Sequence, residues 1–135
     1  MQPDRFTTLA QQALATAQST AQSRSNGMLE PLHLLEAILQ DDGGIGRSII
    51  ERAGGQANLL RDVARRRLDA LPRQSGGQPA TSSAFMQVIQ RAEEEARSLG
   101  DGIVSTEHLL LALAEVKGDA RTALESVELD RRALL

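Results

Sequence analysis

Residues 30–39 read EPLHLLEAIL, and residues 105–114 read STEHLLLALA. His33 and His108 hold the same place in the two stretches and lie 75 residues apart. In each stretch the leucines recur at spacings that gather on one face of an α-helix. Because the same stretch occurs twice, we expect an internal repeat, which constrains the fold more than any single element does.

The similarity extends beyond these two stretches. The dipeptide at residues 28–29 matches the one at 103–104 at the same offset. Further upstream we pair Phe6 with Phe85, which lie 79 residues apart, so the loop after the first helix is expected to be shorter in the second copy. The second copy stops inside the helix equivalent to residues 57–71, which predicts that this chain is a piece of a longer protein.

Helical periodicity covers nearly the whole chain, and no segment shows the strict alternation of a half-buried strand. The expected helices cover residues 4–23, 30–40, 45–53, 57–71, 83–99, 106–116, 120–127 and 130–135. We therefore predict an all-α fold of two pseudo-repeated four-helix units, packed with pseudo-twofold symmetry.

The composition changes at residues 72–80, which read PRQSGGQPA. Two prolines and two glycines in such a short segment favour an exposed linker. The sequence thus predicts one domain over residues 1–135, with a first unit at 4–71 and a second unit at 81–135. A length of 135 residues is typical of a single domain.

The composition excludes several classes of protein. The absence of Cys excludes a disulfide framework, a Cys-bound metal and a thiol nucleophile. The single lysine, Lys117, is followed by Gly118 rather than by Ser or Thr, so the chain has no Walker A loop for ATP. A net charge of −3 and an aromatic content of 1% argue against nucleic-acid binding. We assign no catalytic residues, and we expect no metal site and no cofactor in this chain.

The chain also lacks the signals of a membrane or exported protein. Its apolar runs are too short for a membrane-spanning helix, which needs about 20 consecutive apolar residues. The N-terminus has no basic start followed by an apolar stretch, as a signal peptide would have. We therefore expect a cytoplasmic protein with no membrane partner.

The two histidines could bind a metal or could serve the fold. Neither His33 nor His108 has further ligands at a suitable spacing, since the chain has no Cys and no His-x-x-x-His pair. Their equivalent places at the start of a Leu-rich helix favour a structural hydrogen bond at that helix start.

Several motifs resemble those of the Clp N-terminal repeat domain, which caps the Clp family of AAA+ unfoldase chaperones. They are RFT at residues 5–7 and the two stretches quoted above. The linker LPRQSG at 71–76 and the segment RAEEEARSLGD at 91–101 resemble the ClpB subfamily, the protein disaggregases. The resemblance covers essentially the whole chain.

This resemblance implies a substrate-binding role. In the family, the N domain sits flexibly above a hexameric ATPase ring and binds unfolded or aggregated polypeptide. ATP and magnesium belong to ATPase domains that this chain lacks, so we do not expect the domain itself to be an enzyme. The expected partners are unfolded or aggregated polypeptides, the rest of the hexameric ring and co-chaperones, and the isolated domain is expected to be a monomer.

The resemblance also implies where polypeptide binds. In the family, peptide contacts fall near the start of the first helix and around the break before the sixth, which correspond here to Thr7, Asp101 and Glu107. Carboxylates accept hydrogen bonds from the backbone amides and cationic side chains of an extended chain. Without the family, Thr7 is simply a polar residue in the first turn of a helix.

Apolar residues are expected to complete this site. Some relatives carry an apolar groove on the fifth helix, where this chain has Arg91 and Glu95. We therefore predict that Phe85, Ile89 and Ile103 supply the apolar contacts with substrate.

Two other functions remain open. The similar ClpC-type domain, which like that of ClpA serves a protease-associated unfoldase, receives adaptor proteins and phosphoarginine-tagged substrates through a Glu just before the His of each repeat. Glu107 fills that position in the second repeat, but Leu32 fills it in the first, which together with the linker favours the ClpB type. The remaining alternative is a self-standing helical scaffold with no link to a chaperone.

Overall fold

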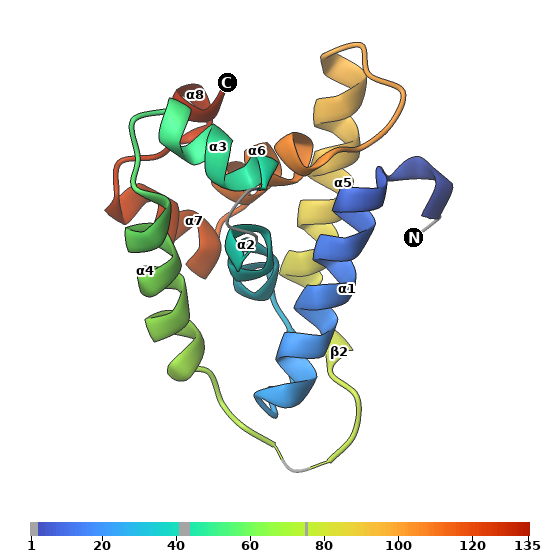
Figure 1. The fold of residues 1–135 in the computed structure, drawn as a ribbon. Helices are drawn as coiled ribbons and strands as arrows, with labels where there is room; N and C mark the ends of the chain where they lie inside the picture. The colour runs from blue at the N-terminus through green and yellow to red at the C-terminus, as the bar shows by residue number, and fades with distance from the viewer. Residues whose placement is uncertain (1–2, 41–43, 75) are drawn as a thin grey trace.

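The fold consists of two helical units joined through short extended segments. The computed structural model describes residues 3–40, 44–74 and 76–135. The elements in these residues (Figure 1) are, in chain order, η1 (Pro3–Arg5, a 3-10 helix), α1 (Thr8–Ser23), β1 (Met28–Leu29), α2 (Pro31–Gln40), α3 (Ile45–Arg52), α4 (Ala57–Asp69), β2 (Ala80–Thr81), α5 (Ser83–Ser98), α6 (Thr106–Glu115), α7 (Asp119–Ser126) and α8 (Arg131–Leu134). Apart from one two-residue pair of strands the described elements are helices, and the predicted all-α class is confirmed.

The helices of the two units correspond in order, and the first three pairs also correspond in length. α1 and α5 each have 16 residues, α2 and α6 each have 10, and α3 and α7 each have 8. The N-caps of α1 and α5, Thr7 and Ser82, lie 75 residues apart, as the two histidines do. The predicted pairing of Phe6 with Phe85 is therefore wrong, because Phe85 is the counterpart of Ala10. The pairing relied on a shared residue type alone. The N-caps of the two helices define the correct register of the repeat.

α1 begins later than predicted. The helix expected over 4–23 starts at Thr8, because the Thr7 hydroxyl accepts a hydrogen bond of 3.1 Å from an amide of the first turn and so caps the helix. Phe6 lies before this cap and forms an isolated parallel bridge with Val104 of the second unit. The chain therefore enters α1 from an extended segment.

The short extended segments of each unit pair with those of the other unit. β1 of the first unit pairs in parallel with β2, with Leu29 opposite Thr81. Thr7 N donates to Val104 O at 2.9 Å, and in the equivalent place Ser82 N donates to Leu29 O at 3.1 Å. The predicted linker therefore ends in a strand, and each unit's first helix follows a segment that pairs with the other unit. Two-residue strands are too short to show an alternation of apolar and polar residues, so the sequence predicted none.

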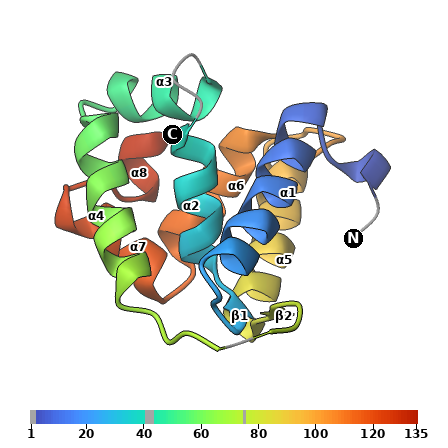
Figure 2. The same cartoon turned by 60° about the horizontal axis from the view of Figure 1, so that its bottom comes forward.

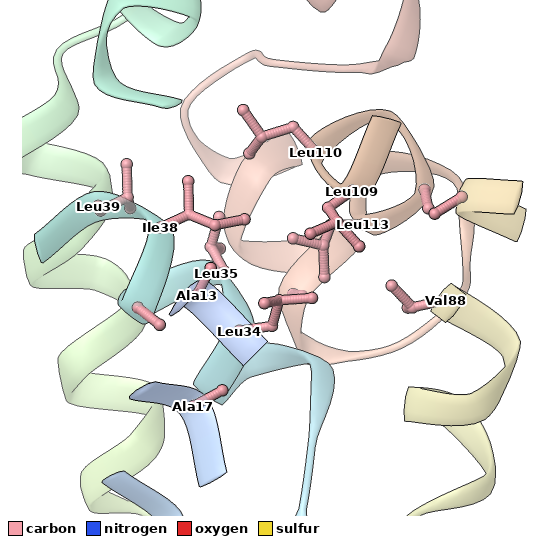
Figure 3. Packing of buried hydrophobic residues seen from close by; sticks show 14 of the residues in the cluster. Ala13, Ala17, Leu34, Leu35, Ile38, Leu39, Val88, Leu109, Leu110 and Leu113 are labelled. Carbon is pink, nitrogen blue, oxygen red and sulfur yellow. The ribbon is translucent and has the colours of Figure 1, made fainter. Parts of the chain in front are cut away.

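α2 and α6 form the centre of the hydrophobic core. α1 and α4 flank α2 (Figures 1 and 2), and α5 packs against α6. In Figure 3, Leu34 and Leu35 of α2 lie toward Leu109 and Leu113 of α6. Both phenylalanines are buried in the same cluster. The small alanines along the buried face of α1 allow that helix to approach the core closely.

None of the helices in the described parts of the chain is both long and apolar enough to span a bilayer. The same parts contain no group of three or more His, Cys, Asp or Glu side chains placed to hold a metal ion.

Candidate functional site

His33 closes a hydrogen-bonded loop at the start of α2. Glu30 N donates to His33 Nδ1 at 2.9 Å, so this nitrogen carries no proton and the ring hydrogen is on Nε2. His33 Nε2 donates that hydrogen to Asn26 Oδ1 at 2.9 Å. The ring is fully buried, and desolvation, with a smaller contribution from the nearby charge of Arg24, lowers the pKa of His33 from 6.5 to about 4. The predicted structural hydrogen bond at the helix start is confirmed.

His108 repeats this arrangement at the start of α6. Ser105 N donates to His108 Nδ1 at 2.9 Å, and His108 Nε2 donates to Asp101 Oδ2 at 2.8 Å. His108 is buried, whereas the side chain of Asp101 is 47% exposed. The histidine thus holds one oxygen of a surface carboxylate, and Oδ1 has no donor among the described residues.

The two units differ at the residue that accepts from the histidine. In the first unit it is Asn26, which is buried and also donates from Nδ2 to Pro72 O at 3.1 Å. In the second unit it is Asp101, which is exposed. The same backbone position therefore carries a buried neutral amide in one copy and a negatively charged surface group in the other.

The hydrogen-bonded residues Asp101, His108 and Ser105 are of the types found in a hydrolytic triad, but they are not arranged to activate the serine. Ser105 Oγ lies 3.1 Å from His108 Nδ1. The single lone pair of that nitrogen already accepts from Ser105 N, so it is not available to take a proton from the hydroxyl. These three residues therefore form a helix-start motif rather than an activated nucleophile.

Glu107 lies in the first turn of α6 and is exposed. No hydrogen bond or ion pair engages its carboxylate among the residues that the structure describes. A negative charge at this end of a helix is favourable, because it faces the positive end of the helix dipole. Glu107 therefore supplies a surface charge that is not paired with any cation of the described residues.

Thr7 stands at the start of α1, where its backbone joins the loop between α5 and α6 through Val104. The side chain of Thr7 is half-buried and caps α1. The next loop residue toward α5, Ile103, is 42% exposed. Figure 1 shows this loop, in orange, passing the beginning of α1. We call the surface around it, formed by Thr7, Asp101, Ile103 and Glu107, the acidic face.

Phe85 and Ile89 do not lie on the acidic face. They are 1% and 4% exposed and belong to the hydrophobic core, on the buried side of α5. Their spacing of four residues indicates a shared helix face, but it does not tell whether that face lies in the core or on a surface groove. Of the predicted site residues, the structure therefore brings together Thr7, Asp101, Ile103 and Glu107.

Arg91 and Glu95, the two charged residues of α5 singled out in the sequence, serve the packing of helices. Glu95 is 2% exposed and receives two hydrogen bonds from Arg131 of α8, at 2.6 and 2.7 Å, and one from Arg91 at 3.2 Å. The hydrogen bonds from Arg131 are the main reason why the pKa of Glu95 is lowered. The sequence holds no signal for this pairing, because Glu95 and Arg131 lie in different helices of the unit.

The duplicated helical unit places the chain among the helical repeat domains. More particularly, the chain belongs to the family described as the Clp repeat (R) N-terminal domain, whose model matches residues 5–127. The predicted membership is confirmed.

Similar proteins occur in bacteria. A chaperone protein ClpB of Propionibacterium freudenreichii subsp. shermanii is 38% identical over 129 residues, which cover 93% of this chain but 15% of that protein. The chain thus spans about 15% of the length of this curated relative.

Solved structures agree with the fold. The Hsp104 N-terminal domain of Candida albicans superposes with a TM-score of 0.84 at 23% identity, covering 96% of this chain and 85% of that one. A ClpV N-domain in complex with a VipB peptide superposes with a TM-score of 0.75 at 18% identity, covering 97% of this chain and 82% of that one. At these identities the likeness concerns the fold alone.

Proposed function

We propose that this chain is the substrate-engaging N-terminal domain of a ClpB-type, ATP-dependent disaggregase and binds unfolded or aggregated polypeptide. The observation that carries the proposal is the acidic face, where Glu107 and one oxygen of Asp101 lack partners among the described residues while the rest of the motif is fully hydrogen-bonded. The ClpB relatives and the peptide bound to a ClpV N-domain support it.

The acidic face suits an extended chain without a fixed sequence. Carboxylates accept hydrogen bonds from backbone amides, which every polypeptide offers, and they attract Lys and Arg side chains. The exposed side chain of Ile103 adds apolar contact beside these charges. Such a small and solvated surface gives weak, sequence-tolerant binding, in the micromolar range or above.

The alternative role, docking of adaptors or phosphoarginine-tagged substrates in a ClpC- or ClpA-type unfoldase, has less support. It relies on an acidic residue before the histidine of each repeat. The first repeat has Leu32 there, which is 1% exposed and lies in the core. Only the second repeat therefore offers a carboxylate at this place.

The family also suggests the assembly, the nucleotide binding and the partners of the full-length protein. We propose that the chain joins to a hexameric AAA+ ring, that ATP and magnesium bind to that ring and not to this domain, and that the protein acts in the cytoplasm with clients and co-chaperones as its partners. The isolated domain is expected to be a monomer and to have no enzymatic activity.

An NMR titration of the ¹⁵N-labelled chain with α-casein, an unfolded protein, tests the proposed function. We expect shifts in the amide signals of residues 101–107 and weaker binding by the double variant Asp101→Asn, Glu107→Gln. The matched control is Asp62→Asn, Glu94→Gln, which removes two exposed charges from α4 and α5. The proposal is wrong if casein shifts no signals, or if the variant Asp101→Asn, Glu107→Gln binds casein as tightly as the control variant does.

A further inference from the structure

Asn26 and Gly27 lie between α1 and β1, and their counterparts in the second unit are Asp101 and Gly102. In each unit the histidine donates a hydrogen bond to the first residue of this pair. The repeat thus carries an Asn-Gly pair in one copy and an Asp-Gly pair in the other. The two pairs differ by the replacement of a side-chain amide with a carboxylate, which is the change that deamidation of asparagine produces.

Gly27 makes Asn26 prone to this reaction, because a glycine has no side chain to shield its nitrogen and its backbone bends freely. In the reaction the backbone nitrogen of Gly27 bonds to Cγ of Asn26 and the Cγ–Nδ2 bond breaks. Nδ2 takes up the proton of the glycine amide and leaves as ammonia. Water then opens the cyclic imide at one of its two carbonyls, which gives either aspartate or isoaspartate, in which the backbone runs through Cγ.

The docking of the linker favours glycine at this position. A Cβ atom on Gly27 would lie 2.6 Å from Cδ of Gln74, so another residue would displace that side chain. Gln74 is held in place by its backbone, since its N donates to Ser25 O at 2.7 Å. A Cβ atom on Gly102 would meet none of the described residues within 4 Å. The close packing of linker residues 72–74 on the turn is therefore specific to the first unit.

The folded structure hinders the reaction at Asn26. This residue is 5% exposed, and its Oδ1 accepts from His33 Nε2 at 2.9 Å while its Nδ2 donates to Pro72 O at 3.1 Å. Attack by Gly27 N makes the planar amide tetrahedral and expels Nδ2, which breaks the hydrogen bond to Pro72. Hydrolysis of the imide also needs water at a buried site. The reaction therefore proceeds from a conformation in which the linker has opened or the chain has unfolded.

The products do not fit the turn as asparagine does. An aspartate at this position places an acceptor oxygen where Asn26 Nδ2 donates to Pro72 O, and it brings a charge into a buried site. Asp101 avoids both costs, because its side chain is 47% exposed and the histidine holds only one of its oxygens. Isoaspartate adds a methylene to the backbone just before β1, which disturbs the pairing of β1 with β2. Either product therefore opposes docking of the linker.

We propose that Asn26 is a deamidation site that folding protects, and that its modification in unfolded chains prevents the linker residues 72–74 from docking after the chain refolds. The reaction consumes only water and releases ammonia. The inference concerns the turn and the linker and does not rest on the proposed function, so casein binding and deamidation are tested separately.

Peptide mapping by mass spectrometry tests the protection. The chain is incubated at mildly alkaline pH in buffer and in guanidinium chloride, and the peptide that contains Asn26 is followed for the replacement of NH₂ by OH. We expect the unfolded chain to deamidate at least about tenfold faster, because modification of the folded chain depends on the population of its open form. Gln74→Ala, which uncovers Gly27, should accelerate the reaction in buffer, whereas Gln90→Ala, at an exposed position on α5, should not. Equal rates in the two conditions, or no acceleration by Gln74→Ala, would overturn the inference.

Limited trypsin digestion tests the effect on the linker. Asn26→Asp reproduces the aspartate product and should raise the rate of cleavage after the exposed Arg73 at least about tenfold, because the linker opens more often. Asn58→Asp is the matched control, since it keeps an acceptor oxygen for Arg47 at an exposed position and should leave cleavage within about twofold.

The chain aged in guanidinium chloride and then refolded provides a second measurement that needs no variant. Its deamidated fraction should be cleaved after Arg73 faster than its unmodified fraction. If neither this fraction nor Asn26→Asp is cleaved faster than the parent chain, the proposed loss of docking is wrong.

Discussion

Asp101 stands in the second unit where Asn26 stands in the first, and each accepts a hydrogen bond from Nε2 of its own histidine. The first unit shows that an amide satisfies this histidine in the same backbone setting. Asp101→Asn should therefore change the free energy of unfolding by less than about 0.5 kcal/mol, as expected at an exposed position. Casein binding should nevertheless weaken, because an amide lacks the charge. Urea unfolding and NMR titration of the same variant check the two expectations, and a large loss of stability would make Asp101 a structural residue.

Acid should destabilise the domain through His33. Its pKa is about 4 when folded and 6.5 in the reference state, so below pH 6.5 the unfolded chain binds a proton that the folded chain does not. Stability therefore falls as the pH drops from about 6.5 toward 4, by about 2 kcal/mol between pH 7 and pH 5. Urea unfolding at the two pH values measures this loss. His33→Gln should unfold more easily at pH 7 but lose much less on acidification, and an equal loss in that variant would assign the effect to other groups.

The ion pairs of Glu95 should make a large contribution to stability. Arg131→Met leaves a buried carboxylate with Arg91 alone and should cost about 2–3 kcal/mol of the free energy of unfolding. Because the pKa of Glu95 is lowered, its contribution is present above the ordinary value of 4.5 and is lost as the pH falls below it. Arg132→Met is the matched control, since no ion pair of Arg132 occurs among the described residues, and its unfolding curve should match the parent's.

Phe85 and Ile103 should separate stability from binding. Phe85→Ala removes a side chain that is 1% exposed and should cost about 3–5 kcal/mol. Ile103→Ser changes a side chain that is 42% exposed and should alter stability by less than about 0.5 kcal/mol while it weakens casein binding. Thermal unfolding followed by circular dichroism compares the two. A stable Phe85→Ala variant would contradict the core position of that ring.

Thr7 should contribute both to stability, by capping α1, and to the binding of polypeptide at the acidic face. Thr7→Ala removes the acceptor for the first turn of α1 and should cost about 1 kcal/mol, as should Ser82→Ala at the equivalent start of α5. Thr7→Asp keeps a capping oxygen and should preserve stability. If Thr7→Asp and Thr7→Ala both weaken casein binding while Ser82→Ala does not, the Thr7 hydroxyl contacts substrate directly.

Much of the fold could be predicted because the repeat is encoded in rare residues. His33 and His108 are the only histidines, and their offset of 75 residues carries through most of the chain. Phe6 and Phe85 are equally rare, yet their pairing was wrong, since one lies before a helix and the other inside one. Composition cannot distinguish these cases, whereas the capping hydrogen bonds of the two helices do.

The site was less accessible to prediction than the fold. Asp101 and His108 are hydrogen-bonded across a loop, seven residues apart, and no helix or strand periodicity predicts such a contact. The burial of Phe85 and Ile89 depends on how α5 is rotated against α6, which a helical pattern alone does not determine. The contrast between Asn26 and Asp101 emerges only when the structural register of the repeats is known.

The strand pairs between the two units show that neither unit is complete without the other. A chain with one unit alone would leave its entering strand without a partner, since Phe6 pairs with Val104 and Thr81 pairs with Leu29 across the units. Two identical copies could satisfy both edges at once by associating around a twofold axis. A single unit of this kind is therefore expected to associate as a homodimer, and joining two units in one chain turns a contact between molecules into one within the chain. Within one chain the two halves need not stay identical, and α1 without a charged residue faces solvent beside an α5 that carries five.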